Sequence, residues 1–197
     1  MNTPEREVLR AFRQHVYPLF GCRRDALFAA LDAVLSAPTL DTPAHLSLAP
    51  TCHRRWGSRY EALNAGRMDL ARLERLAASY PLEPQTTWFA VDASVWPRCD
   101  AETSPERGSS HQPYRQSHGQ PMVAGWNSSW LVQVPRRCAS WTAPLRVRRI
   151  LPGENRNLVA AEQMCSWLGQ VGPLATGASG PICTCAAGYD AVQLSLA

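Results

Sequence analysis

The sequence contains no lysine, so all 20 of its basic residues are arginine. The planar guanidinium of arginine pairs with phosphate oxygens in a bidentate way, so an arginine-only set of cations suits a phosphate-bearing partner. A genome rich in G and C favours arginine codons and explains the same bias, together with the many alanine, glycine and proline residues. The two explanations do not exclude each other, and the formal net charge of +4 is mild.

The sequence also has no stretch long and apolar enough to span a membrane, and its N-terminus lacks the pattern of a signal peptide. These absences predict a cytoplasmic protein with no membrane partner. The seven cysteines are odd in number and include no C-x-x-C motif, so neither a disulfide framework nor a structural zinc site is expected. The composition, 45% hydrophobic and 18% charged, is typical of a soluble globular protein, and 197 residues can bury one core, or one core plus a small helical domain.

Residues 1–80 are predicted to form a helical N-terminal region. Apolar residues recur at helical spacing in four segments, and a proline or glycine follows each of them: Pro18, Pro38, Gly66 and Pro81. Pro81 also marks the boundary with a second predicted domain, residues 85–197.

A cluster of arginines lies in this helical region, around a tryptophan. Arg54, Arg55 and Arg59 flank Trp56. The arginines could contact DNA phosphates while the indole packs against sugar or base, which would make residues 1–80 a DNA-binding region. The other interpretation is a solvated loop anchored by Trp56, because no helix-turn-helix spacing is evident.

The apolar run Trp88–Val91 predicts a buried strand that ends at an acid, Asp92. Small residues and a proline follow the acid. A carboxylate at the end of a core strand is costly to bury unless it is paired, hydrogen-bonded or bound to a metal. Asp92 is therefore either an acid that accepts hydrogen bonds from nearby backbone N–H groups or a metal-ligating acid of a nuclease-like site.

The region after Asp92 alternates between polar and apolar segments. Residues 97–120 are polar and too long for a plain hairpin loop, and loops of that length are often functional. Residues 121–134 predict a hairpin of two strands with its tight turn at Asn127-Ser128, because asparagine tolerates positive φ.

The segment 135–149 is basic. If it forms a strand, alternation places Arg146 and Arg148 on one face. A basic face beside an acidic site suits a phosphodiester substrate, whereas charges on an exposed edge strand also protect it from pairing with other chains. The candidate nucleic-acid-binding residues of this segment are Arg136, Arg137, Arg146, Arg148 and Arg149.

The order of the later elements predicts the fold class. A helix over 154–170 follows the early strands, and Ile182–Cys185 forms a short strand after it. Three early strands, a crossover helix and a strand parallel to the first make a partial ribonuclease H-like mixed sheet, so the chain is predicted to be α/β (α+β). In this arrangement the first and fourth strands are neighbours, and the ends of the strands bring Asp92 close to residues 186–190.

Several motifs taken together resemble a known family, the actinobacterial insertion-sequence transposases with a DDE-type catalytic domain. The resemblance implies a ribonuclease H-like domain, Mg²⁺, and cutting and joining of double-stranded DNA at transposon ends. The motifs are Val91-Asp92-Ala93-Ser94, Ser104–Gly108, His118–Pro121, Ala124–Trp126 and Pro152–Asn157.

The resemblance also assigns residues. It places the first catalytic and metal-binding acid of the family on Asp92. The second acid belongs to an Asp-Ala-Gly-Tyr motif that here reads Ala186-Ala187-Gly188-Tyr189, so Ala186 stands in its place. Asp190 comes four residues later, and the third acid of the family lies further downstream than Ala197.

These departures predict a truncated, inactive copy that keeps part of the fold and affinity for DNA. With Asp92 alone, a metal pair loses most of its ligands and the charge that holds it. We expect Asp92 and Ala186 on neighbouring strands with Cα atoms within about 10 Å, and an uncovered sheet edge that favours a homo-oligomer. The alternative is a non-catalytic DNA-binding or transposition-interfering protein, and a remnant without a selected role is a third interpretation.

Overall fold

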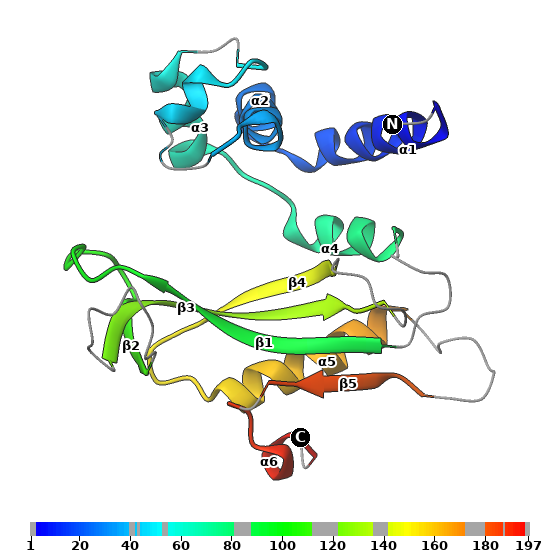
Figure 1. The fold of residues 1–197 in the computed structure, drawn as a ribbon, viewed down its shortest axis with the longest axis vertical. Helices are drawn as coiled ribbons and strands as arrows, with labels where there is room; N and C mark the ends of the chain where they lie inside the picture. The colour runs from blue at the N-terminus through cyan, green and yellow to red at the C-terminus, as the bar shows by residue number, and fades with distance from the viewer. Residues whose placement is uncertain are drawn as a thin grey trace. The chain divides into compact units, whose positions relative to one another are not determined.

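The computed structural model is α+β, and its contacts divide the chain into two compact units, Met1–Leu76 and Ala77–Ala197. The first unit is helical and the second contains the sheet (Figure 1). The residues that the structure describes are 3–39, 42, 44–52, 55–80, 88–111, 122–135, 142–171, 180–186 and 188–195.

The helices of the first unit follow the predicted segments. They are α1 (Thr3–Val16), α2 (Arg24–Ser36) and α3 (Trp56–Ala65), and α4 (Leu70–Ala78) crosses the boundary between the units. The short 3-10 helices η1 (Tyr17–Leu19) and η2 (His45–Leu48) lie between them. The small side chains of α2 permit close packing, and the buried apolar residues of the unit include Val16, Leu19, Phe20, Ala26, Ala30, Ala33 and Ala62.

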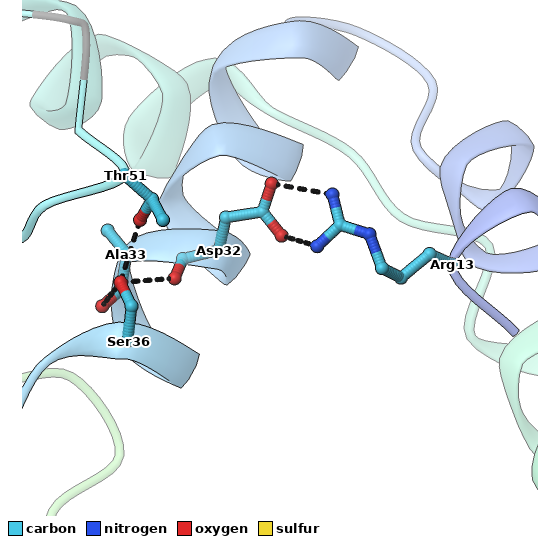
Figure 2. A network of polar contacts seen from close by, with 5 residues as sticks. All are labelled: Arg13, Asp32, Ala33, Ser36 and Thr51. Atoms are coloured by element: carbon cyan, nitrogen blue, oxygen red, sulfur yellow. Dashed lines mark hydrogen bonds and ion pairs between the residues drawn. The ribbon is translucent and has the colours of Figure 1, made fainter. Parts of the chain in front are cut away.

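A polar network joins α1, α2 and the segment after η2 (Figure 2). The guanidinium of Arg13 on α1 forms a bidentate ion pair with Asp32 on α2 and lies over the ring of Phe28, 5.0 Å from its centroid. The hydroxyl of Ser36 donates to the carbonyl oxygen of Asp32 at 2.8 Å and lies 2.7 Å from the hydroxyl of Thr51. This network fixes the chain just before the arginine cluster.

The second unit is built on a mixed sheet of five strands (Figure 1). The long strand β3 pairs antiparallel with β1 along one edge and with β2 and β4 along the other, while β5 pairs parallel with β1. The strands are β1 (Trp88–Pro97), β2 (Gly108–His111), β3 (Met122–Gln133), β4 (Ala143–Ile150) and β5 (Ile182–Cys185), and the helices are α5 (Arg156–Val171) and α6 (Ala191–Ser195). A helix followed by a strand parallel to the first confirms the predicted ribonuclease H-like arrangement.

One face of this sheet holds the core of the unit. Phe89, Val91 and Leu131 point from β1 and β3 toward Ala160 and Trp167 of α5. Successive residues of a strand face opposite sides, so the residues between them line the other side of the sheet. We call that other side, which on β1 carries Trp88, Asp92, Ser94 and Trp96, the open face.

The structure corrects the predicted end of the first strand. β1 does not stop at Asp92 but continues to Pro97, and its partner β3 follows it as far as Gly125. Ala93 and Val95 stay half-buried on the core side, which preserves the alternation of a two-faced strand beyond the acid.

The predicted hairpin at Asn127-Ser128 is wrong, because β3 runs through both residues without a turn. The polar side chains in this part of β3 are instead bonded or buried within the sheet unit. The side chain of Asn127 exchanges hydrogen bonds of 2.8 and 2.6 Å with the hydroxyl of Ser110 on β2, and Ser129 is fully buried. β2 itself was not predicted, because Gly-Ser-Ser-His has no apolar alternation, and residues 112–120 lie outside the described part of the chain.

The close approach of β1 and β3 at Gly125 yields a test of this register. A Cβ atom at position 125 would clash with the carbonyl oxygen of Trp96 and lie 3.1 Å from the Cα atom of Pro97. We expect Gly125→Ala to lower the free energy of unfolding by about 1–3 kcal/mol, the usual cost of overpacking. Urea denaturation measures this value.

A matched control lies in α5, where a Cβ atom at Gly169 would meet nothing within 4 Å. Gly169→Ala should raise stability by up to about 1 kcal/mol, because alanine favours the helix. A Gly125→Ala protein as stable as the original chain would contradict the register.

Candidate functional site

The candidate catalytic acid, Asp92, lies in the middle of β1 and is exposed on the open face. It pairs in register with Trp130 of β3. Its Oδ1 accepts a hydrogen bond of 2.7 Å from the backbone N–H of Ala93. The free-energy cost expected for burying the carboxylate of Asp92 therefore does not arise, because solvent reaches this group and the backbone N–H of Ala93 donates a hydrogen bond to it.

Ala186, to which the resemblance assigns the place of the second acid, lies directly beside Asp92. Val91 pairs with Cys185 in the parallel ladder, and the backbone N–H of Ala186 donates to the carbonyl oxygen of Val91 at 3.2 Å. The ladder thus continues one residue past β5, so positions 92 and 186 are neighbours across two strands. A carboxylate at 186 would stand next to the one on Asp92, whereas alanine supplies only a methyl group.

Asp190, four residues after Ala186, is engaged at the start of α6. Its Oδ1 accepts hydrogen bonds from the backbone N–H groups of Val192 at 2.9 Å and Gln193 at 3.3 Å, as a helix N-cap does. Its own N–H donates to Asn157 on α5 at 2.9 Å. The carboxylate of Asp190 is thus committed to holding a helix end.

The residues around Asp92 do not fit a bound Mg²⁺ ion. This ion prefers octahedral oxygen coordination through carboxylates, but the neighbours of Asp92 across the sheet are the methyl group of Ala186 and the indole of Trp130. Within the described ranges, no three His, Cys, Asp or Glu side chains come together where they could hold a metal. Among Asp92 and these two neighbours, the carboxylate of Asp92 is the group that could coordinate a metal ion.

Tyr189, from the Gly-Tyr part of the motif, packs against the core cluster behind this site. Burial raises the pKa of its phenol, and the negative charge of Asp92 raises the pKa further. The phenol therefore stays neutral and is no substitute for an acidic metal ligand.

A cavity of about 380 Å³ lies on the opposite side of the sheet from the carboxylate of Asp92. Ala93 and Val95 of β1 form part of its wall, together with Ser110, Asn127 and Arg156. From the sequence alone, none of these polar residues was assigned to a cavity, because their contribution depends on β2 and on the continuation of β1. Strand β1 lies between the cavity and the acid, because it carries Asp92 on one face and lines the cavity with its other face.

The arginines of β4 are largely engaged within the protein. Arg146 and Arg148 pair with Leu131 and Ser129, so they share the core-side face, as alternation predicted. Arg148 forms ion pairs with Glu154 at 2.8 Å and Glu162 at 2.6 Å. It holds β4 to α5 and is a poor candidate for phosphate binding.

Arg149, on the open face, is also paired. Its guanidinium contacts the carboxylate of Glu106 at 3.2 Å and lies over the ring of Trp126, 5.0 Å from the centroid. Sequence reasoning missed a second arginine on the same ring, Arg98, which lies 5.1 Å from the centroid. Trp88 and Trp96 each lie four residues from Asp92, so the alternation of a strand places both indoles on the face of the acid. This spacing is the sequence signal that could have revealed an aromatic strand face.

Of the N-terminal arginine cluster, the structure buries one arginine and exposes another. Arg59 is only 2% exposed and contacts the sulfur of Cys52, so it cannot reach a phosphate. Arg55, the N-cap residue of α3, is exposed. Arg54, Arg136 and Arg137 lie outside the described residues.

Comparison with protein families gives a match over most of the chain. The family model described as DDE superfamily endonuclease matches residues 15–196, which cover both units. No curated protein and no solved structure matches the chain. Among the described helices, none is long and apolar enough to cross a lipid bilayer. The match spans nearly the whole sequence, and the chain therefore belongs to the DDE superfamily endonuclease family.

Proposed function

We propose that this chain has a transposase-type function, in which it binds double-stranded DNA at the ends of an insertion sequence and Asp92 is the first acid of the catalytic site. DDE superfamily endonucleases generally depend on divalent metal ions, and Mg²⁺ is the ion we propose for the complete site of this family, although the residues around Asp92 in this chain do not fit it. The observation that carries the proposal is the parallel pairing of β1 with β5, which brings positions 92 and 186 side by side. Acids that share a metal pair must project from adjacent elements in this way.

The same geometry supports a loss of cleavage in this chain. Metal-assisted phosphoryl transfer needs several carboxylates to hold ions about 4 Å apart. Ala186 removes one of them, and Asp190 is occupied as a helix cap. The chain as it stands therefore binds DNA without cutting it.

A second candidate function follows from the presence of alanine at position 186. A protein that occupies transposon ends without cutting them would interfere with an active transposase, and it would need only the DNA-binding surface. The two candidates differ in whether the chain interferes with an active transposase, and both require affinity for duplex DNA.

The first test concerns DNA binding. Arg55 is exposed, whereas Arg148 is held by two carboxylates. We expect the full chain to bind duplex DNA with an affinity that falls steeply with salt, because phosphate contacts release counterions. Arg55→Ala should reduce the slope of log affinity against log salt by about 1. Fluorescence anisotropy with a labelled duplex measures both quantities.

Arg148→Ala is the matched control. It should leave the salt slope unchanged and cost about 1 kcal/mol of stability or less, because the ion pairs are partly exposed. Binding that is absent at low salt, or indifferent to salt, would refute the proposed DNA-binding function.

The second test concerns the incomplete site. We expect no Mg²⁺- or Mn²⁺-dependent nicking of supercoiled plasmid by the chain as given. Ala186→Asp should create a pair of carboxylates beside each other, so that Mn²⁺ raises the melting temperature of this variant but not of the original chain. The double variant Asp92→Ala, Ala186→Asp should lose the effect.

Two outcomes would count against this assignment. Plasmid nicking by the original chain that disappears in Asp92→Ala would show that cleavage survives without an acid at 186. An Ala186→Asp protein indifferent to Mn²⁺ would show that position 186 does not share a metal site with Asp92.

A further inference from the structure

The open face of the sheet exposes several tryptophan side chains. Trp88 and Trp96 on β1 are 38% and 67% exposed, and Trp130 on β3 is 37% exposed. Directly opposite residues of paired strands lie on the same face. The pairs Trp96 with Trp126, and Asp92 with Trp130, therefore gather these indoles on the side of the sheet that carries the candidate acid.

Two of the indoles are anchored by hydrogen bonds. The ring N–H of Trp126 donates to the carbonyl oxygen of Pro105 at 3.0 Å, and that of Trp130 donates to the hydroxyl of Ser94 at 2.8 Å. Such bonds restrict the rotation of each ring. Trp96 and Trp130 belong to register positions four residues apart, or about 13 Å along the strands. The face thus presents aromatic rings at separated positions, and the ring of Trp130 is held in place by its hydrogen bond.

Cations accompany the rings. The guanidinium groups of Arg98 and Arg149 lie over Trp126, 5.1 and 5.0 Å from its ring centroid. A guanidinium stacked on an indole keeps its edge N–H groups available, and those groups match phosphate oxygens in geometry. Arg149 already contacts Glu106, which leaves Arg98 as the better candidate for an external anion.

The residues between the rings argue against an apolar protein partner. The Ser94–Ser128 pair separates the Asp92–Trp130 pair from the Trp96–Trp126 pair. The centre of a protein interface is usually apolar and poor in charge. A nucleic acid strand, in contrast, presents flat bases with polar edges joined by phosphates, and it is bound by aromatic rings interleaved with polar groups and cations.

We propose that the open face binds unpaired DNA bases, with Trp96 and Trp130 as stacking surfaces and Arg98 as a contact for the phosphate backbone. The inference rests on the proposed function, in that it takes DNA to be the ligand. It adds that the strand beside Asp92 is held single-stranded, because base faces become accessible to an indole only outside the double helix.

The test uses the full chain and a labelled thymidine oligonucleotide, with binding measured by fluorescence anisotropy. Trp96→Leu should weaken binding by roughly tenfold, because base–aromatic stacking contributes strongly at each position. Trp96→Phe should retain most of the affinity, since it keeps a ring. Trp96 is largely exposed, so both variants should melt close to the original temperature.

Val147 provides the matched control. It pairs with Trp130, lies on the same face and is 52% exposed, but it has no ring. Val147→Ala should bind the oligonucleotide as the original chain does. Equal losses in Trp96→Leu and Val147→Ala, or no loss in Trp96→Leu, would overturn the stacking proposal.

Further measurements separate the possible failures. Duplex binding should be unaffected by Trp96→Leu. If duplex binding is intact and salt-dependent while Trp96 does not matter for single strands, the stacking proposal alone fails. If the original chain binds neither form of DNA, the proposed function fails with it. Self-association of the original chain that Trp96→Leu abolishes, without single-strand binding, would identify the face as a protein interface and overturn the proposal.

Discussion

The parallel pairing of β1 with β5 is the constraint on which the rest of the sheet unit depends. The two strands are far apart in sequence, and the chain can align them in parallel only by crossing over the sheet, which it does with α5. That crossover buries Ala160 and Trp167 against Phe89 and Leu131. The same ladder sets position 186 beside Asp92 through the bond from Ala186 to Val91.

The alternation of side chains along β1 then gives the sheet one face that packs in the core and one face that carries Asp92. Val91 points into the core and fixes the strand, while Asp92 points to solvent among tryptophans. The cavity near Ser110 and Arg156 belongs to the core side, so the acid does not point into it. A substrate that reaches Asp92 must therefore lie on the open face.

Much of this arrangement was predictable from sequence, for local reasons. Helical spacing ended by proline or glycine located α1 to α4, and the apolar Ile182–Cys185 run located β5. The errors in the sheet have a common cause, which is that polar residues were taken to end or turn a strand. Asn127 instead accepts a hydrogen bond from Ser110 of β2, Ser129 is buried within the sheet unit, and Arg59 is buried in its own unit. Such long-range partners leave no periodic signal in a single sequence.

The central claim is that position 186 is the neighbour of Asp92, so that an alanine there leaves the acid without its partner. A direct measurement is disulfide cross-linking of the double variant Asp92→Cys, Ala186→Cys, with linked peptides identified by mass spectrometry. Adjacent strands lie about 4.8 Å apart, within the range of Cα separations that a disulfide spans. The account predicts a 92–186 link under mild oxidation and none for Asp92→Cys combined with Asp190→Cys. A 92–190 link without a 92–186 link would contradict it.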